Sequence, residues 1–90
     1  AVLTRCRELV AEAGRGMGVR PEDLLPPAVL REVVWRAAEE LDAAAAPQRG
    51  RAPWDTDSVA RRLSSAGARP WQVRIAAPLI ARAYSEEAEG

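Results

Sequence analysis

Apolar residues recur at helical spacing along almost the whole of this 90-residue chain, and no segment alternates in polarity as a strand would. A chain of this length forms one domain at most. We therefore predict that residues 1–90 form a single compact all-α bundle. Its four main helices are expected over residues 2–17, 27–45, 57–66 and 70–87, with a short helical turn at 21–25. The apolar face of the first helix comprises Val2, Cys6, Leu9, Val10, Ala13 and Met17.

Glycine and proline mark the ends of the predicted helices. Gly18 fits the left-handed residue that commonly ends a helix, with Val19 folding back onto that helix. Pro27 and Pro70 stand at first helical positions, where the N–H that proline lacks would have no partner. Pro78 falls inside the last helix, where it removes one backbone hydrogen bond and is expected to bend the helix.

Several residues between the helices are expected to pack. Leu24 and Leu25 are predicted to fill the core. Trp35 lies off the apolar stripe of its helix, and we expect it to pack against the last helix or the preceding connector rather than a ligand. Residues 46–57 have the composition of a linker or insertion. Trp54 is expected to anchor this segment to the bundle, the alternative being an exposed contact residue.

All thirteen basic residues are arginine, and the chain has no lysine or histidine. A GC-rich genome would produce this bias, but the planar guanidinium also binds phosphate at two points and stacks on bases. The net charge is zero and unevenly spread: −2 in residues 1–45, +5 in 46–85 and −3 in the tail. The basic second half contains three aromatic residues and is a mild indication of nucleic-acid binding.

The single cysteine, Cys6, cannot form an intrachain disulfide and excludes a cysteine-based metal site. It falls on the apolar face of the first predicted helix, so we expect an inert buried thiol, which suits a reducing compartment. No apolar run approaches the roughly 20 residues that span a membrane, and nothing resembles a signal peptide. We expect a cytoplasmic protein that engages no membrane.

Candidate catalytic residues are scarce. General acid–base catalysis usually employs histidine or a carboxylate with a shifted pKa, and no histidine is present to activate a serine. The nearest acidic cluster, Asp55-Thr56-Asp57, lies at a predicted helix start. There we expect Thr56 or Asp57 to cap free N–H groups rather than to bind a metal ion. We therefore predict no catalytic residue and no metal ligand, and a chain that is not an enzyme by itself.

The last predicted helix carries the side chains best suited to bind nucleic acid. Its side opposite the apolar face combines a tryptophan, which can stack on a base, with arginines, which can hold phosphates. That side comprises Trp71, Arg74, Pro78, Arg82 and Ser85. With arginines from the preceding helix and loop, the candidate nucleic-acid-binding residues are Arg61, Arg62, Arg69, Trp71, Arg74 and Arg82. The competing interpretation is that Trp71 caps the core and the arginines form a solvated face.

Two blocks of the sequence resemble the C-terminal region of ribonuclease D-like 3′–5′ exonucleases of the actinobacterial kind. They are GVRPEDLLPPAVLREVVW at 18–35 and GARPWQVRIAAPLIARA at 67–83, whereas 36–57 matches poorly. The resemblance implies a helical domain related to HRDC (helicase and RNase D C-terminal) modules, following a catalytic domain that this chain lacks. It also implies that the parent enzyme uses divalent metal ions, held by four carboxylates of the catalytic domain. A start at Ala1, within a predicted helix and without an initiator methionine, fits such a fragment.

Two functions of different classes fit these observations. The first is an accessory nucleic-acid-binding domain, without a cofactor of its own, that helps position RNA for the catalytic domain of the same polypeptide. Its partner would be single-stranded or structured RNA, bound weakly and with salt-sensitive affinity. The second is a structural docking module that packs on the catalytic or a neighbouring helical domain without binding nucleic acid. A third option is an unrelated helical adaptor. In each case we expect a monomer.

Overall fold

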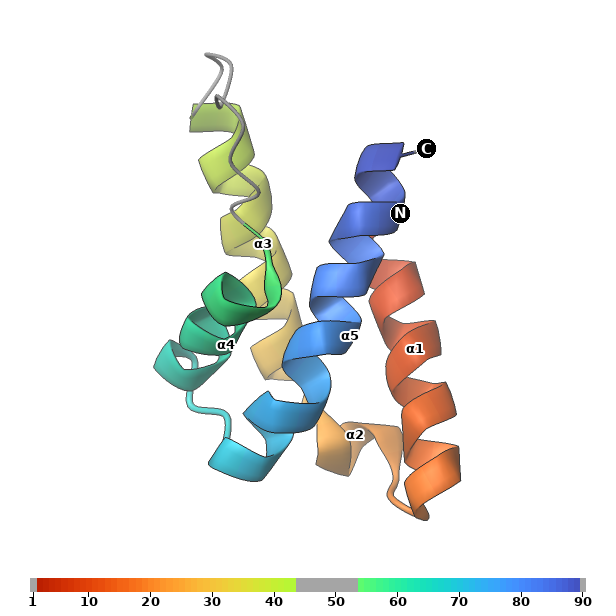
Figure 1. Ribbon diagram of the computed structural model, residues 1–90. Coiled ribbons are helices and arrows are strands. Elements are labelled where there is room, and N and C mark those ends of the chain that lie inside the picture. Colours follow the sequence, from red (N-terminus) through yellow and green to blue (C-terminus); the bar gives the residue numbers. More distant parts are fainter. Residues whose placement is uncertain (1, 44–53, 90) are drawn as a thin grey trace.

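The computed structural model describes residues 2–43 and 54–89, which contain five helices and no strand. This confirms the predicted all-α bundle of four main helices and one short turn. The predicted linker sequence at 47–53 lies outside the described residues. None of the described helices combines the length and the apolar character needed to cross a membrane. The helices are α1 (Val2–Met17), α2 (Pro21–Leu24), α3 (Pro27–Ala43), α4 (Thr56–Ser65) and α5 (Pro70–Glu89), as Figure 1 shows.

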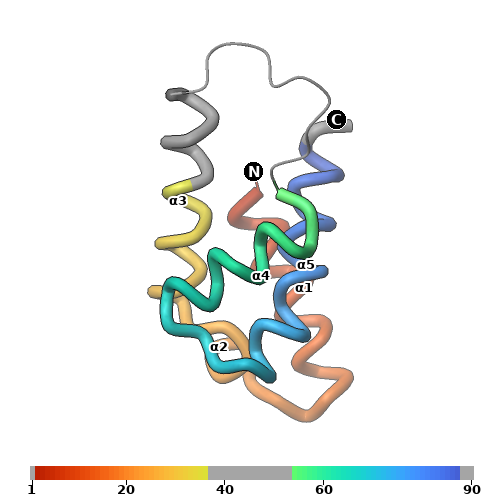
Figure 2. The backbone as a smooth tube through the Cα atoms, turned by 60° about the vertical axis from the view of Figure 1, so that its left-hand side comes forward, coloured from red at the N-terminus to blue at the C-terminus, as the bar shows by residue number. Residues whose placement is uncertain are grey.

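Helix α5 runs through the middle of the bundle and contacts α1, α2 and α4. It is antiparallel to α1 on one side and meets α4 on the other (Figure 1). Helix α4 crosses obliquely between α3 and α5, and α2 closes one end of the bundle (Figure 2). Helix α3 packs on α1 and α4. The core therefore lies around α5, with α4 separating it from much of α3.

The core is built mainly from the side chains that helical spacing predicted. Leu24 and Leu25 are buried in it from the connector, also as predicted. Helix α5 contributes mostly small side chains, so the other helices can approach it closely. Among the residues whose burial is described, the remaining buried apolar ones are Cys6, Leu9, Val10, Leu30, Val33, Trp54, Val59, Leu63, Ala76, Ala77, Ile80 and Ala83.

Two residues that were expected to pack are exposed instead. Met17 is 46% exposed, because α1 ends there and Val19 takes the place against the core after the turn. Trp35 is 66% exposed. It lies about 160° around α3 from the buried Val33, and α4 stands between α3 and α5 (Figure 2). The predicted contact of Trp35 with the last helix or the connector is therefore wrong.

Glycine ends α1 and α4 in the same way. Gly18 and Gly67 have φ angles of 71° and 97°, the left-handed conformation that glycine adopts without strain. After Gly18, the Val19 N–H donates to the carbonyl of Gly14 at 2.8 Å, and the equivalent bond after Gly67 is 3.0 Å. This is the Schellman motif. It confirms the predicted stop at Gly18 and the folding back of Val19.

Gln72 fastens α2 to the start of α5. Its Oε1 accepts a hydrogen bond from the backbone N–H of Arg69 at 2.7 Å, as the third residue of a capping box does. Its Nε2 donates to the backbone carbonyl of Asp23 at 2.9 Å. Gln72 is the buried polar side chain among the described residues. Both ends of its amide are satisfied, so its burial carries little penalty.

Gly14 and Gly16 provide a matched test of how closely the chain at Val19 approaches α1. A Cβ atom at Gly14 would overlap the Val19 carbonyl oxygen, whereas one at Gly16 would meet nothing within 4 Å. We expect Gly14→Ala to destabilise the fold by about 1–3 kcal/mol, as overpacking does. Gly16→Ala should stabilise it by up to about 1 kcal/mol through helix propensity. Urea denaturation of both variants measures this, and equal effects would contradict the close approach at Gly14.

The buried thiol predicts a loss of stability at alkaline pH. Burial raises the pKa of Cys6 to about 11, whereas an unfolded thiol titrates near about 8.5. Because the folded state disfavours the thiolate, a protonated Cys6 favours the folded protein. This contribution to the free energy of unfolding is fully present below the unfolded pKa and is lost as the pH rises toward the folded pKa of about 11. Thermal melts between these two pH values should show a falling melting temperature, and Cys6→Ala should reduce that fall. Burial also raises the pKa of Tyr84. The same melts on Tyr84→Phe measure how much of the fall in melting temperature is due to Tyr84.

Candidate nucleic-acid interface

The structure divides the six candidate residues between two parts of the bundle. Arg61 and Arg62 lie on α4 and line a pocket that α4 forms with α3. The other four candidates belong to α5 or immediately precede it, and they do not line that pocket. The arginines of α4 and those of α5 therefore have different neighbours, although the sequence suggested one shared surface.

The predicted polar stripe of α5 faces solvent. Arg74, Pro78, Arg82 and Ser85 are exposed, and so is Arg69 before the helix. Exposure also explains how α5 tolerates Pro78, because the carbonyl that loses its helical donor can bond to water.

Trp71 differs from the rest of the stripe. It is half-buried and packs against the core, as the structural interpretation of this residue predicted. Half of the residue at most is thus available to stack on a base.

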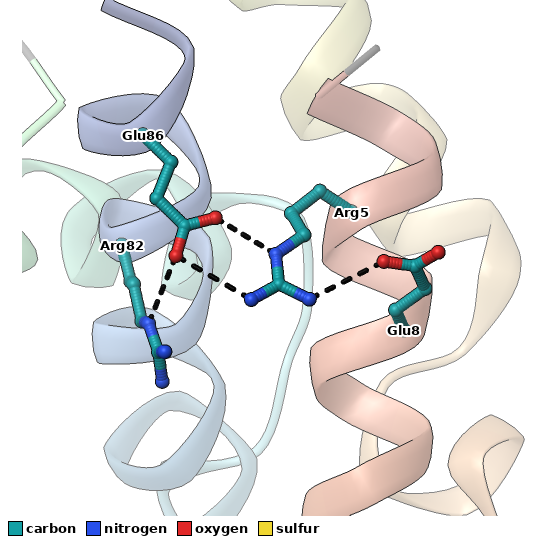
Figure 3. A network of polar contacts seen from close by, with 4 residues as sticks. All are labelled: Arg5, Glu8, Arg82 and Glu86. Carbon is teal, nitrogen blue, oxygen red and sulfur yellow. Dashed lines mark hydrogen bonds and ion pairs between the residues drawn. The ribbon is translucent and has the colours of Figure 1, made fainter. Parts of the chain in front are cut away.

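Arg82 takes part in an ion-pair network that joins α5 to α1 (Figure 3). Its Nε donates to Oε2 of Glu86 at 3.1 Å. Arg5 of α1 donates to the same carboxylate from Nε at 2.7 Å and from Nη2 at 3.4 Å, and it also contacts Glu8 at 3.3 Å. The bond from Arg5 is the main reason that the pKa of Glu86 is lowered. Two arginines and two glutamates cancel in charge, so the network carries no net charge.

Arg62 serves largely in packing. Its Cζ lies 3.8 Å from the centroid of the Trp54 ring, a cation–π contact. Trp54 is 6% exposed and stacks on Tyr84, with ring centroids 4.8 Å apart and planes inclined by 22°. The predicted anchoring role of Trp54 is confirmed. The last four residues of the predicted linker 46–57 thus belong to the bundle, because α4 already begins at Thr56.

The α3–α4 pocket has a volume of about 240 Å³ and a basic lining. Arg36, Arg61 and Arg62 contribute three positive charges, and Glu32 contributes one negative charge, so the lining carries a net charge of +2. Arg36 Nη2 donates to Glu32 Oε1 at 3.2 Å. Sequence reasoning missed Arg36, because the face of α3 that meets α4 is set by tertiary packing. The lining is completed by Val33, Ser58, Ser65 and Ala66.

The acidic cluster at the start of α4 serves as a helix cap. Asp55 is the N-cap, and its Oδ1 accepts from the Ser58 N–H at 2.8 Å. The expected cap, Thr56 or Asp57, was misplaced because α4 begins at Thr56 itself. Within the described part of the chain, no group of three or more Cys, His, Asp or Glu residues could hold a metal ion. The acidic residues at the start of α4 therefore do not form a ligand set like the two-metal site, which the resemblance places in the separate catalytic domain.

A protein-family model described as the 3′ to 5′ exonuclease C-terminal domain matches residues 1–84, nearly the whole chain. The chain belongs to this family. It is thus a helical domain associated with 3′–5′ exonucleases, as the two sequence blocks indicated. No curated protein and no solved structure matches the chain.

The Glu86 network of this exonuclease C-terminal domain predicts a loss of stability in acid. A carboxylate whose pKa is lowered by folding stabilises the fold above its unfolded pKa, near about 4.3, and this contribution is lost as pH falls through the folded value. Glu86→Gln should lower the urea midpoint modestly at pH 7 and change it little in strong acid. Glu87→Gln, an exposed neighbour, is the control. An equal effect at both positions would mean that the network contributes nothing specific.

Proposed function

We propose that this domain is the accessory nucleic-acid-binding domain of a cytoplasmic ribonuclease D-like 3′–5′ exonuclease of the actinobacterial kind. Its fold would be HRDC-like, and it would act as a monomeric unit beside the catalytic domain of the same polypeptide. Its task would be to hold single-stranded or structured RNA near that catalytic domain. Hydrolysis, with its divalent metal ions, would belong to the catalytic domain, so this domain is not an enzyme by itself.

The family match carries this proposal. An exonuclease acts on a phosphodiester chain, and phosphate is the group that exposed arginines bind best. Arg61, Arg69 and Arg74 are exposed, and none of them forms an ion pair with another described residue. Exposed arginines of this kind add little to the stability of a fold. Phosphate binding would account for these exposed arginines, which the stability of the fold does not require.

The number of available arginines implies weak binding. Each phosphate contact releases counterions, so the affinity should fall steeply as salt rises. A weak domain is still useful when it is tethered to a catalytic domain, because the tether raises the effective concentration of the bound RNA at the active site.

Docking on another domain is the second candidate function. It is favoured by the α1–α5 side, where Arg5, Arg82, Glu8 and Glu86 neutralise one another. A network without net charge attracts phosphate weakly, whereas polar groups are tolerated at the solvent-accessible rim of a protein interface. This side could therefore pack on a neighbouring domain while arginines elsewhere remain free to bind RNA.

Salt titration of binding to a fluorescent single-stranded RNA tests the proposed function. We expect wild type to bind at low salt, with log affinity falling linearly with log salt. Arg69→Ala/Arg74→Ala should bind more weakly and reduce the slope by about 0.7 for each phosphate that the variant no longer neutralises. Arg7→Ala/Arg15→Ala removes the same charge from exposed positions of α1 and should have a smaller effect.

Two outcomes would count against RNA binding by the proposed residues. Absence of wild-type binding at high micromolar protein and low salt would favour the docking function. Equal losses in both double variants would mean that only the total charge of the domain matters.

A further inference from the structure

The α3–α4 pocket collects basic side chains from two helices that are separate in the sequence. On α4 its lining residues follow the spacing i, i+3, i+4, i+7 and i+8 from Ser58 to Ala66, which is one continuous helical stripe. Arg61 is exposed on this stripe, whereas Arg62 is held against Trp54 behind it. One arginine of α4 therefore faces solvent at the pocket, and the second packs on Trp54.

The α3 side of the pocket begins at a buried valine, and an exposed tryptophan lies farther around the same helix. Val33 is 2% exposed and belongs to both the core and the pocket lining. Going around α3 from Val33 in one direction, Arg36, Glu32 and Trp35 follow at about 60°, 100° and 160°. Trp35 does not itself line the pocket, but it is the next of these side chains around α3 after the lining residue Glu32.

We propose that the α3–α4 pocket binds one phosphodiester group of a single-stranded nucleic acid, with Trp35 stacking on an adjacent base. Arg36 and Arg61 would donate to the phosphate oxygens from opposite walls. This inference rests on the proposed function and deepens it, since it assigns the RNA contact to a particular site. It adds Arg36 and Trp35 to the binding residues.

The size and charge of the pocket fit one group of a longer chain. Pockets that enclose a whole small-molecule ligand usually measure about 300–1,000 Å³, and this one measures about 240 Å³. Arg36 and Arg61 carry two positive charges against the single negative charge of Glu32, and the excess matches the single negative charge of a phosphodiester. Glu32 occupies one of the five N–H donors of Arg36. The remaining donors can reach a phosphate, while Glu32 holds the guanidinium at the mouth of the pocket.

The exposure of Trp35 gives the proposal its second, independent support. At 66% exposed, the indole gains little from the described bundle and presents apolar surface to water. Aromatic side chains next to a basic groove are the usual stacking platforms of proteins that bind single strands. Because every base has a π-face, such a platform would accept RNA without regard to sequence.

The test compares Arg36→Ala/Arg61→Ala with Arg69→Ala/Arg74→Ala and with Arg7→Ala/Arg15→Ala, all binding the same fluorescent single-stranded RNA. These arginines are exposed, so urea midpoints should remain close to that of wild type. We expect the pocket variant to lose about 10-fold or more in affinity and to show the smallest salt slope. If it binds like the α1 control while the α5 variant is impaired, the pocket is not the site, although RNA binding by the domain stands. If wild type does not bind, both proposals fail.

Tryptophan fluorescence tests the stacking step. Unlabelled RNA should quench the emission of wild type, and Trp35→Leu should lose most of this quenching together with about 10-fold in affinity. An abasic oligonucleotide should bind wild type and Trp35→Leu equally, since it offers phosphate without bases. Unchanged quenching in Trp35→Leu would overturn the role of Trp35. Polyglutamate of matched charge is the last arm: binding as tight as that of RNA would make the pocket a docking site for acidic protein segments instead.

Discussion

The small-residue face of α5 is the constraint on which the rest of the bundle depends. Ala76, Ala77 and Ala83 are buried there beside Ile80, and α1, α2 and α4 all contact this helix. The distance between packed helices is set by the side chains at their contact, so larger residues on this face would push the surrounding helices outward. Polar contacts hold the same helix at both ends. Gln72 links its start to α2, and the Arg5–Glu86 pair links its last turns to α1.

The stack of Arg62, Trp54 and Tyr84 positions α4 on α5, and α4 forms one wall of the pocket. Tyr84 belongs to α5, and Trp54 immediately precedes the cap of α4, so their contact fixes how α4 lies on α5. Arg62 packs on the Trp54 ring of the same stack. Once α4 is oriented in this way, its next stripe faces α3, and Arg61 comes to the pocket wall. Neighbouring arginines in the sequence thus have different tasks, one in packing and one at the surface.

Local signals in the sequence sufficed for most of the fold. Gly18, Pro27 and Pro70 marked helix ends correctly, and the apolar spacing identified nearly all of the described core. The failures share a physical cause, which is that they depend on how distant helices meet. Trp35 could be placed off the apolar stripe of α3, but only the position of α4 decides that the described bundle leaves it largely exposed. Arg36 became a candidate for the same reason, since no local pattern reveals which face of α3 meets α4. The cap of α4 was misplaced by one or two residues, a usual uncertainty for helix ends.

The two sides of the bundle suggest how nucleic-acid binding and docking could coexist. From the sequence alone, the same arginines of the last helix could serve either nucleic-acid binding or docking. In the structure, Arg82 is neutralised within the α1–α5 network, whereas the described lining of the α3–α4 pocket keeps an excess of positive charge. An ion-paired surface costs less to bury against protein than a guanidinium group such as that of Arg61, which forms no ion pair with another described residue. A neighbouring domain would therefore be accommodated best on the α1–α5 side. The pocket would then stay open to solvent, which is the condition that a passing RNA strand requires.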